Sequence, residues 1–135
     1  MKLQVNLMFQ GRCEAAFRLY QSVFGGELET LRYEGSPIED QVPADWGDKL
    51  AHATLTFGTQ SLSGADIATE APVKPPAFYL LVSTESAAET RRVADQLSVG
   101  GEVIMPVQQT FFSSAYGIVV DRFGVGWKLS CSSVP

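Results

Sequence analysis

The sequence predicts an α+β fold built from two successive β-α-β-β-β units, and three observations carry this prediction. A segment suited to a strand, alternating in the first half and a short apolar run in the second, precedes a segment in which hydrophobic residues recur every three or four residues, and this order occurs twice. A pair of glycines ends each predicted helix, at residues 25–26 and 100–101. A proline-rich stretch separates the two halves. The 135 residues are enough for one domain with one sizeable core.

Composition and charge exclude several classes of protein. With 45% hydrophobic and 19% charged residues, the chain is globular and too apolar to be disordered. Its net charge of -5 argues against a nucleic-acid partner, because phosphate binding needs clustered lysines and arginines. No apolar run approaches the roughly 20 residues that cross a bilayer, and no signal peptide is visible. We therefore expect a cytoplasmic protein with no membrane association.

Hydrophobic periodicity places the elements of the first unit. An alternating segment opens the chain, with four apolar residues on one face: Leu3, Val5, Leu7 and Phe9. A helical stripe follows, made of Cys13, Ala16, Phe17, Tyr20, Val23 and Phe24. The predicted order is a strand over residues 3–9, a helix over 12–24, a strand over 27–34, a loop over 35–48, and a hairpin of 50–57 with 60–64.

The pattern restarts after a connector over residues 66–76, which contains three prolines and shows no periodicity. Residues 78–83 form an apolar run suited to a strand. Ser86 and Glu89 form a capping box before a helix with one apolar face: Ala87, Thr90, Ala94 and Leu97. The single domain therefore contains module one over about residues 1–65 and module two over about residues 77–133.

A sequence repeat supports two equivalent units. Residues 24–28, Phe-Gly-Gly-Glu-Leu, match residues 99–103, Val-Gly-Gly-Glu-Val, at an offset of 75. Residues 56–58, Thr-Phe-Gly, match residues 122–124, Arg-Phe-Gly, at an offset of 66. The first pair lies where a helix meets a strand and the second lies in a hairpin, as a duplicated unit requires. Chance matches are the alternative, because glycine favours helix ends and turns in any fold.

The two cysteines, Cys13 and Cys131, are too few and too far apart for a zinc site or a disulfide framework. We interpret both as reduced, small core residues. A single bridge between them is the alternative, since the sequence does not tell whether they lie close together.

Two groups of residues carry a resemblance to a known family. The opening group is Phe9, Gly11, Cys13, Ala16-Phe17, Tyr20 and Phe24-Gly25-Gly26, and the closing group is Thr110-Phe111-Phe112, Tyr116-Gly117, Asp121-Arg122-Phe123-Gly124-Val125 and Trp127. Together they resemble the PhnB-like branch of the vicinal-oxygen-chelate superfamily, which includes glyoxalase I, bleomycin-resistance proteins and extradiol dioxygenases. Two positions depart from the branch: Phe112 stands where it usually has Trp, and Gly126 where it usually has Pro.

The resemblance implies how the two units are used. In that superfamily each unit curls into half of a glyoxalase-like open barrel, two units enclose a cup-shaped cavity for a small molecule, and the protein is a homodimer. Its enzymes hold a divalent metal through His, Glu or Gln of the first and last strands of each unit. The corresponding positions here offer Gln4, Asn6, Ser61, Ser63, residues 78–81 and Lys128. An ammonium group has no lone pair and repels a cation, so we predict no metal and no other cofactor.

His52 is the only histidine of the chain. On its strand the alanines, Leu55 and Phe57 suit packing against a helix, so His52 and Thr54 point the other way, toward the predicted cup, as Asn6 does from the first strand. One interpretation is a structural histidine with a hydrogen bond. The other is a ligand contact or general base, which needs a partner to orient the ring.

Lys128 shares a strand face with Gly126 and Ser130, opposite Trp127. If that face lines the cup, Lys128 attracts an anionic or carbonyl-bearing ligand; a solvated strand lysine is the alternative. Phe111, Phe112 and Tyr116 form an aromatic cluster. Phe112 and Tyr116 line the pocket in one interpretation, and the cluster belongs to the core or to a dimer interface in the other.

The sequence supports three functions. The first is binding of a small molecule without a metal, anionic if Lys128 takes part, for which Asn6, His52, Thr54, Phe112, Tyr116 and Lys128 are the candidate contacts. The second is a glyoxalase-type lyase or transferase, metal-dependent or with His52 as acid or base. The third is a role in dimerisation or protein binding, in which the cup is vestigial. Trp46, in the long loop, is either a lid or an interface anchor. Motifs for nucleotides, for serine hydrolysis and for adenosylmethionine are absent from the sequence.

Overall fold

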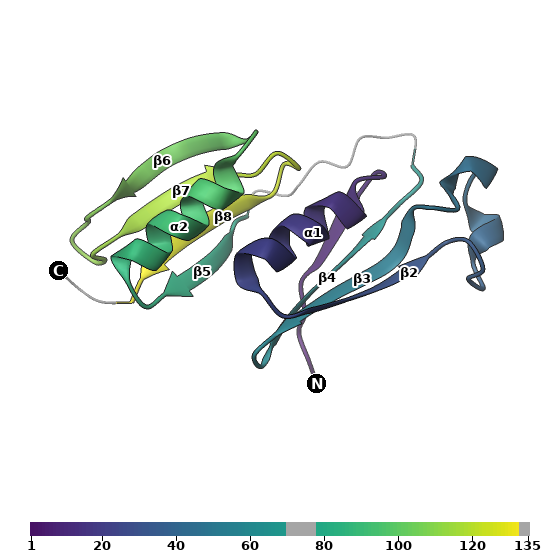
Figure 1. Ribbon diagram of the computed structural model, residues 1–135, viewed down its shortest axis with the longest axis horizontal. Coiled ribbons are helices and arrows are strands. Elements are labelled where there is room, and N and C mark those ends of the chain that lie inside the picture. The colour runs from purple at the N-terminus through teal and green to yellow at the C-terminus, as the bar shows by residue number, and fades with distance from the viewer. Residues whose placement is uncertain (70–77, 133–135) are drawn as a thin grey trace. The chain divides into compact units, whose positions relative to one another are not determined.

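A computed structural model describes residues 1–69 and 78–132. The chain divides into two compact units, Met1–Lys74 (unit 1) and Pro75–Pro135 (unit 2). Each unit has its own four-stranded sheet and its own helix, in the predicted β-α-β-β-β order (Figure 1). In the part of the chain described, no helix is long and apolar enough to cross a membrane.

Unit 1 contains one parallel and two antiparallel strand pairs. Its elements are β1 (Asn6–Phe9), α1 (Cys13–Phe24), β2 (Glu27–Arg32), β3 (Leu50–Phe57) and β4 (Gln60–Asp66), with two short 3-10 helices, Glu39–Gln41 and Ala44–Trp46, in the predicted long loop. The sheet order is β1-β4-β3-β2, in which β1 and β4 run parallel. The first strand therefore pairs with the last strand of the unit, and α1 connects β1 to the far edge.

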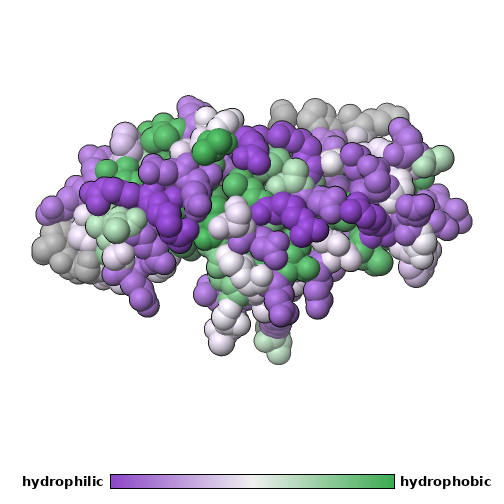
Figure 2. Space-filling model, in the orientation of Figure 1, coloured by the Kyte–Doolittle hydropathy of each residue, from purple (hydrophilic) through white to green (hydrophobic). Residues whose placement is uncertain are grey.

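The predicted helical stripe of α1 forms the core of unit 1. Five of its six residues are buried: Cys13, Ala16, Phe17, Tyr20 and Val23. The strand β3 buries Ala53 and Leu55 and leaves His52 exposed, as its alternation predicts. The outward surfaces of α1 and of the second helix are largely hydrophilic (Figure 2), which is typical of amphipathic helices with one face on a sheet.

A buried carboxylate holds the beginning of α1. Asp66 ends β4 and is only 1% exposed. Its Oδ1 accepts hydrogen bonds from the backbone N–H of Gly11 at 2.7 Å and of Cys13 at 3.0 Å, and its Oδ2 accepts one from Leu50 N–H at 3.0 Å. One side chain therefore joins the start of α1 to the start of β3, and it satisfies amides that have no partner within their own helix.

Unit 2 repeats the same topology. Its elements are β5 (Leu80–Thr84), α2 (Ala87–Ser98), β6 (Glu102–Gln108), β7 (Tyr116–Val120) and β8 (Gly126–Cys131), in the sheet order β5-β8-β7-β6 with β5 and β8 parallel. The predicted cap at Ser86 is confirmed, because its Oγ accepts a hydrogen bond from Glu89 N–H at 3.1 Å. The Glu89 carboxylate accepts one from Glu85 N–H at 3.0 Å. Four residues of α2 are buried: Thr90, Val93, Ala94 and Leu97.

The repeated glycines occupy equivalent positions in the two units. A Cβ atom added to Gly26 would lie 2.1 Å from the carbonyl oxygen of Thr56, and one added to Gly101 would lie 2.2 Å from that of Val120. In both units this glycine precedes a strand whose first residue pairs with the residue that carries that oxygen. The repeat therefore reflects a close approach of two backbones, which only glycine permits.

The turn between β7 and β8 explains most of the closing sequence group. Asp121 is 2% exposed, and its Oδ1 accepts hydrogen bonds from Phe123 N–H at 2.9 Å and Val125 N–H at 3.0 Å. Its Oδ2 accepts one from Trp127 Nε1–H at 2.9 Å. Asp121 and Trp127 therefore stabilise the hairpin, and this part of the closing group has a structural role.

Several predicted element boundaries are wrong. The first strand begins at Asn6, because its pairing with β4 begins there, so Leu3 is 99% exposed and does not belong to a buried face. β2 ends at Arg32, β4 continues through Asp66 into the predicted connector, and β5 begins at Leu80. The rest of the predicted connector, from residue 70 onward, lies outside the described residues.

Candidate functional site

In each unit the helix covers one face of the sheet and leaves the other face without a helix of that unit. In unit 1 this open face carries, across the four strands, a row of polar side chains: Asn6, Ser63, Thr54 and Glu29. Two predicted residues, Asn6 and Thr54, thus flank Ser63 on neighbouring strands. His52 lies on the same face, two residues before Thr54.

His52 has a hydrogen-bond partner on its own strand. The distance from His52 Nε2 to Thr54 Oγ1 is 2.8 Å, and Thr54 Oγ1 lies 3.4 Å from Ser63 Oγ. A hydroxyl can donate to the ring nitrogen or accept from it, depending on the tautomer. His52 thus has the hydrogen-bond partner that a structural histidine needs. Its role as a ligand contact or general base stays a prediction.

A polar hollow of about 350 Å³ lies over this part of unit 1. Its lining consists mainly of hydroxyl and amide side chains with one imidazole: Lys2, Gln4, His52, Thr54, Thr56, Thr59, Gln60, Ser61 and Ser63, with Gly58. Gln4 Nε2 donates a hydrogen bond to Ser61 Oγ at 2.7 Å. Such a surface offers donors and acceptors for a polar, uncharged group.

The open face of unit 2 is mainly apolar around one lysine. Lys128 lies at its centre, directly opposite Leu81 on β5 and Ile118 on β7. The side chain of Lys128 is half-buried, and Leu81 is 64% exposed. The Lys128 Nζ lies 5.6 Å from the centre of the Tyr79 ring. Within residues 1–69 and 78–132, the Lys128 ammonium has no hydrogen bond and no ion pair.

The predicted aromatic residues lie on the same side of unit 2. The rings of Phe112 and Tyr116 meet edge to face with centroids 4.9 Å apart, and Phe111 meets Phe112 in the same way at 5.1 Å. Tyr116 pairs with Ser130, which lies on the same face as Lys128. Phe111 is 91% exposed and Phe112 47%, so neither belongs to the core of unit 2.

The six predicted contact residues therefore form two groups. Asn6, His52 and Thr54 lie together on unit 1, whereas Phe112, Tyr116 and Lys128 lie together on unit 2. The enclosure of both faces in one cup stays a prediction. Sequence reasoning missed Tyr79 as a neighbour of Lys128, and the available signal was Gly126, whose lack of a side chain makes room for that ring.

The donor groups on these faces do not fit a divalent metal. At the superfamily positions, unit 1 offers the amides of Gln4 and Asn6 and the hydroxyls of Ser61 and Ser63, and unit 2 offers the Lys128 ammonium. In the described parts of the chain, no group of three or more His, Cys, Asp or Glu side chains could hold an ion. Neutral hydroxyls and an ammonium are poor ligands for the metals that such sites bind.

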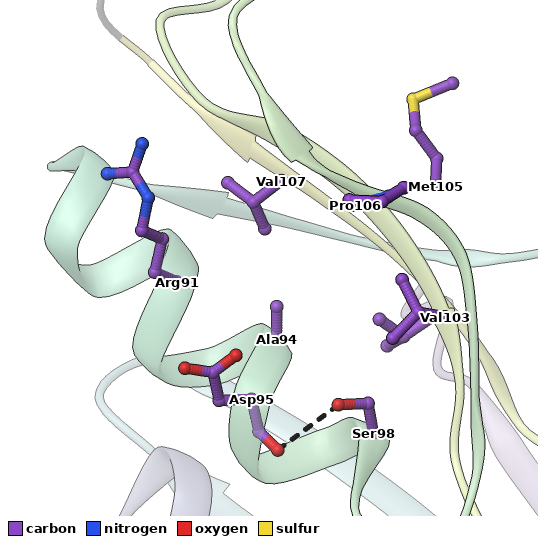
Figure 3. Close-up of a pocket in the computed structure, with 9 residues that line it drawn as sticks. Arg91, Ala94, Asp95, Ser98, Val103, Met105, Pro106 and Val107 are labelled. Atoms are coloured by element: carbon purple, nitrogen blue, oxygen red, sulfur yellow. Dashed lines mark hydrogen bonds between the residues drawn. The ribbon is translucent and has the colours of Figure 1, made fainter.

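Two further hollows contain none of the six predicted residues. One of about 270 Å³ lies between α2 and β6, and its lining includes Ala94 and Asp95 of the helix and Val103 and Val107 of the strand (Figure 3). The other, of about 430 Å³, lies in the loop before β3 and is rich in carboxylates: Glu34, Glu39, Asp40, Asp45 and Asp48. In that loop Trp46 is half-buried, with its ring centre 6.5 Å from that of Tyr33, and its role as lid or anchor stays open.

Cys13 is a buried free thiol and Cys131 is another, as the sequence predicts. Burial raises the pKa of Cys13 to about 12, with further increases from Asp66 and Glu14. The thiol is therefore an inert core group at neutral pH rather than a nucleophile, because the thiolate is the reactive form.

The raised pKa of Cys13 predicts a loss of stability in alkali. The unfolded chain releases this proton near pH 9, whereas the folded protein retains it to about pH 12. The free energy of unfolding should therefore fall over this window, by up to about 1.4 kcal/mol per pH unit from this group. Urea unfolding at pH 8 to 10.5 should show that the free energy of unfolding of Cys13→Ala falls less steeply with pH than that of the wild type. Burial also raises the pKa of Tyr33, so this residue accounts for part of the fall that remains in the variant. Equal slopes in both proteins would contradict this assignment.

The chain is similar to bacterial proteins over nearly its whole length. A family model described as 3-demethylubiquinone-9 3-methyltransferase matches residues 1–130. Protein PA1353 from Pseudomonas aeruginosa is 36% identical, with 96% of this chain and 98% of that one covered and a TM-score of 0.85. The PhnB protein from Bacillus cereus is 28% identical, with 97% and 99% covered and a TM-score of 0.79. A glyoxalase-related enzyme from Fulvimarina pelagi shares the fold at 14% identity, with 97% and 88% covered and a TM-score of 0.61.

Proposed function

This chain belongs to the PhnB-like family whose model is described as 3-demethylubiquinone-9 3-methyltransferase, within the vicinal-oxygen-chelate superfamily, and on that premise we propose that it binds a small organic anion without a metal. The observation that carries the proposal is the ammonium of Lys128, a half-buried residue at the centre of the open face of unit 2 that has no hydrogen bond or ion pair with residues 1–69 or 78–132. The anionic group of the ligand pairs with this ammonium.

The surroundings of Lys128 favour a bound anion over a solvated lysine. An ammonium beside Leu81 and Ile118 loses part of its hydration, and no carboxylate of the described chain replaces that hydration. Apolar neighbours also strengthen an ion pair with a ligand, because they exclude water from it. Lysine is seldom placed in such a position without an ionic partner, and among the described residues its neighbour is the Tyr79 ring, so an anion from outside the chain completes the arrangement.

The hollow on unit 1 supports a complementary role for the other predicted residues. We propose that Asn6, His52 and Thr54 contribute hydrogen bonds to neutral polar groups of a ligand. The bond between His52 Nε2 and Thr54 Oγ1 at 2.8 Å fixes the ring on this face and leaves its other nitrogen for a ligand.

A methyl donor is not part of the proposal. The start of α1 is satisfied by the Asp66 carboxylate, and the start of α2 by Ser86. At each helix N-terminus, one of the amides that could meet the charged end of a molecule such as adenosylmethionine is therefore already bound by a side chain. The sequence also lacks a motif for that cofactor, so the proposed function contains no methyl transfer.

Replacing Lys128 by methionine tests the proposal. Methionine preserves most of the side-chain volume and removes the charge, so we expect affinity for organic anions to fall about tenfold or more, which corresponds to about 1.4 kcal/mol. The measurement is isothermal titration of wild type and variant with acetate, succinate, benzoate and 2-oxoglutarate. Lys49→Met is the matched control, because it removes the same charge from unit 1 and should change affinity less than twofold. A wild-type protein that binds none of these anions, or a Lys128→Met variant that binds them equally, would contradict the proposal.

Acid-base chemistry at His52 is a second candidate function, favoured by the hydroxyl that orients its ring. The test is turnover of the hemithioacetal of methylglyoxal and glutathione, with and without added Zn²⁺, Ni²⁺ or Mn²⁺. Turnover that His52→Gln abolishes would support a glyoxalase-type enzyme. Equal rates with and without the protein would exclude this candidate.

We also propose that the protein is a homodimer. Apolar side chains are exposed on the edge strands of both sheets, among them Leu31 on β2 and Val103 and Ile104 on β6, and a second copy could cover them. Light scattering should give twice the chain mass of 14.6 kDa. A mass equal to one chain at micromolar concentration would refute the dimer.

A further inference from the structure

The ring of Tyr79 occupies space that a side chain at residue 126 would fill. A Cβ atom added to Gly126 would lie 2.5 Å from Cδ1 and 2.6 Å from Cε1 of Tyr79. Any residue other than glycine would displace the ring.

The side chains of Tyr79 and Lys128 form a pair on the open face of unit 2. The Lys128 ammonium lies 5.6 Å from the Tyr79 ring centre, within the range of a cation–π interaction. Tyr79 remains 42% exposed, so part of its ring is available to a further planar group. The ring thus holds the ammonium on this face and offers an aromatic surface beside it.

A second group of aromatic rings lies on the same face of unit 2, at the end of β8 toward Ser130. Phe112 packs edge to face on Tyr116, whose strand neighbour Ser130 is two residues from Lys128 on the same face. Residues in such a diagonal relation have Cβ atoms roughly 7–8 Å apart, within reach of long side chains.

We infer that the organic anion bound by unit 2 is an aromatic carboxylate, and that Tyr79 and Gly126 determine this preference. The inference rests on the proposed function and deepens it. The carboxylate pairs with Lys128, which supplies the complementary charge, and the ligand ring packs against the exposed aromatic rings of Tyr79 and Phe112. Aromatic pairs contribute favourable free energy beyond their buried area, which separates an aromatic acid from a saturated one of similar size by the several-fold difference in affinity tested below.

The test compares benzoate and 1-naphthoate with cyclohexanecarboxylate, which has the same charge and nearly the size of benzoate but no π-system. Isothermal titration should show benzoate binding about fivefold more tightly than cyclohexanecarboxylate to the wild type, with 1-naphthoate tighter still. Tyr79→Leu should reduce the aromatic preference to less than twofold and leave cyclohexanecarboxylate affinity within about twofold. Gly126→Ala, which displaces the same ring without touching Lys128, should have the same effect. Phe57→Leu, an aromatic-to-leucine change in unit 1, is the matched control and should retain the preference.

The outcomes separate the inference from the proposed function. Equal affinities of the wild type for benzoate and cyclohexanecarboxylate, both weakened by Lys128→Met, would overturn the aromatic preference and leave anion binding intact. An aromatic preference that survives both Tyr79→Leu and Gly126→Ala would overturn the assignment to these residues. Failure of all three acids to bind the wild type would overturn the inference together with the proposed function. Circular dichroism melting establishes that each variant is folded.

Discussion

The Asp66→Ala variant is expected to lose about 4 kcal/mol of unfolding free energy. The carboxylate accepts three hydrogen bonds from buried or partly buried amides, of Gly11, Cys13 and Leu50. Each amide left without an acceptor costs roughly 1–3 kcal/mol, and the relief from removing a buried charge offsets only part of the sum. The measurement is urea unfolding at pH 7, followed by circular dichroism.

Two further variants make this prediction specific. Asp66→Asn retains one carbonyl oxygen for Gly11 and Cys13 but directs an amide group at Leu50 N–H, so its loss should be intermediate, about 2 kcal/mol. The control Asp45→Ala removes an exposed carboxylate from the long loop and should stay within about 0.5 kcal/mol of wild type. A loss below about 1 kcal/mol for Asp66→Ala would mean that the three amides find other acceptors.

The second large effect is expected for Gly101→Ala, which should cost about 3 kcal/mol. The added Cβ would lie 2.2 Å from the Val120 carbonyl oxygen and 2.8 Å from the Asp121 carbonyl carbon, both backbone atoms of the paired strand and its turn. Relief requires β6 to move away from β7, because no flexible side chain can yield instead. Forced expansion of a packed structure typically costs about 1–3 kcal/mol, and a backbone contact lies at the upper end of that range.

Gly47→Ala is the matched control for this substitution. It introduces the same methyl group at a residue with an ordinary helical backbone conformation, φ -54°, where the nearest side-chain atom is 3.4 Å away. Its unfolding free energy should change by less than about 0.5 kcal/mol. The equivalent change in unit 1, Gly26→Ala, should cost more than Gly101→Ala, because Gly26 also has φ +88°. Equal losses for Gly47→Ala and Gly101→Ala would refute the close-approach argument.

The sequence is sufficient to predict which side chains share a face wherever a strand alternates. On β3 it places His52 opposite Ala53 and Leu55, and the structure confirms this, because the two apolar residues are buried under α1 while His52 is exposed. The same reasoning places Lys128 opposite Trp127 and Leu129. Such predictions succeed because a period of two leaves only one way to bury the apolar set.

Long-range partners cannot be predicted in this way. Sequence pattern assigns Asp66 to a connector, since a single Asp before a proline-rich stretch is typical of a loop. Its role depends on the loop after β1 and on the start of β3, segments that only the folded chain brings together. The same pattern assigns Leu3 to a buried face for a related reason: alternation says which residues share a face but not where the partner strand begins.

The candidate site is predictable in part. Local pattern places His52 and Thr54 on one face, but their hydrogen bond depends on rotamers that the sequence does not specify. The contact of Tyr79 with Lys128 joins residues almost fifty positions apart, through the parallel pairing of β5 with β8. Its only local trace is Gly126, and a single glycine in a strand does not indicate which side chain fills the space beside it.

The parallel pair of β1 with β4 governs how synthesis of the chain can proceed. A nascent polypeptide cannot complete the first sheet until β4 has left the ribosome, because β1 has no other strand partner in the described chain. Once Asp66 has emerged, every strand of that sheet is present while the second half is still being translated. The first half should therefore acquire protease resistance on stalled ribosomes after this point and not before it, and shorter intermediates should depend on chaperones that shield the apolar stripe of α1.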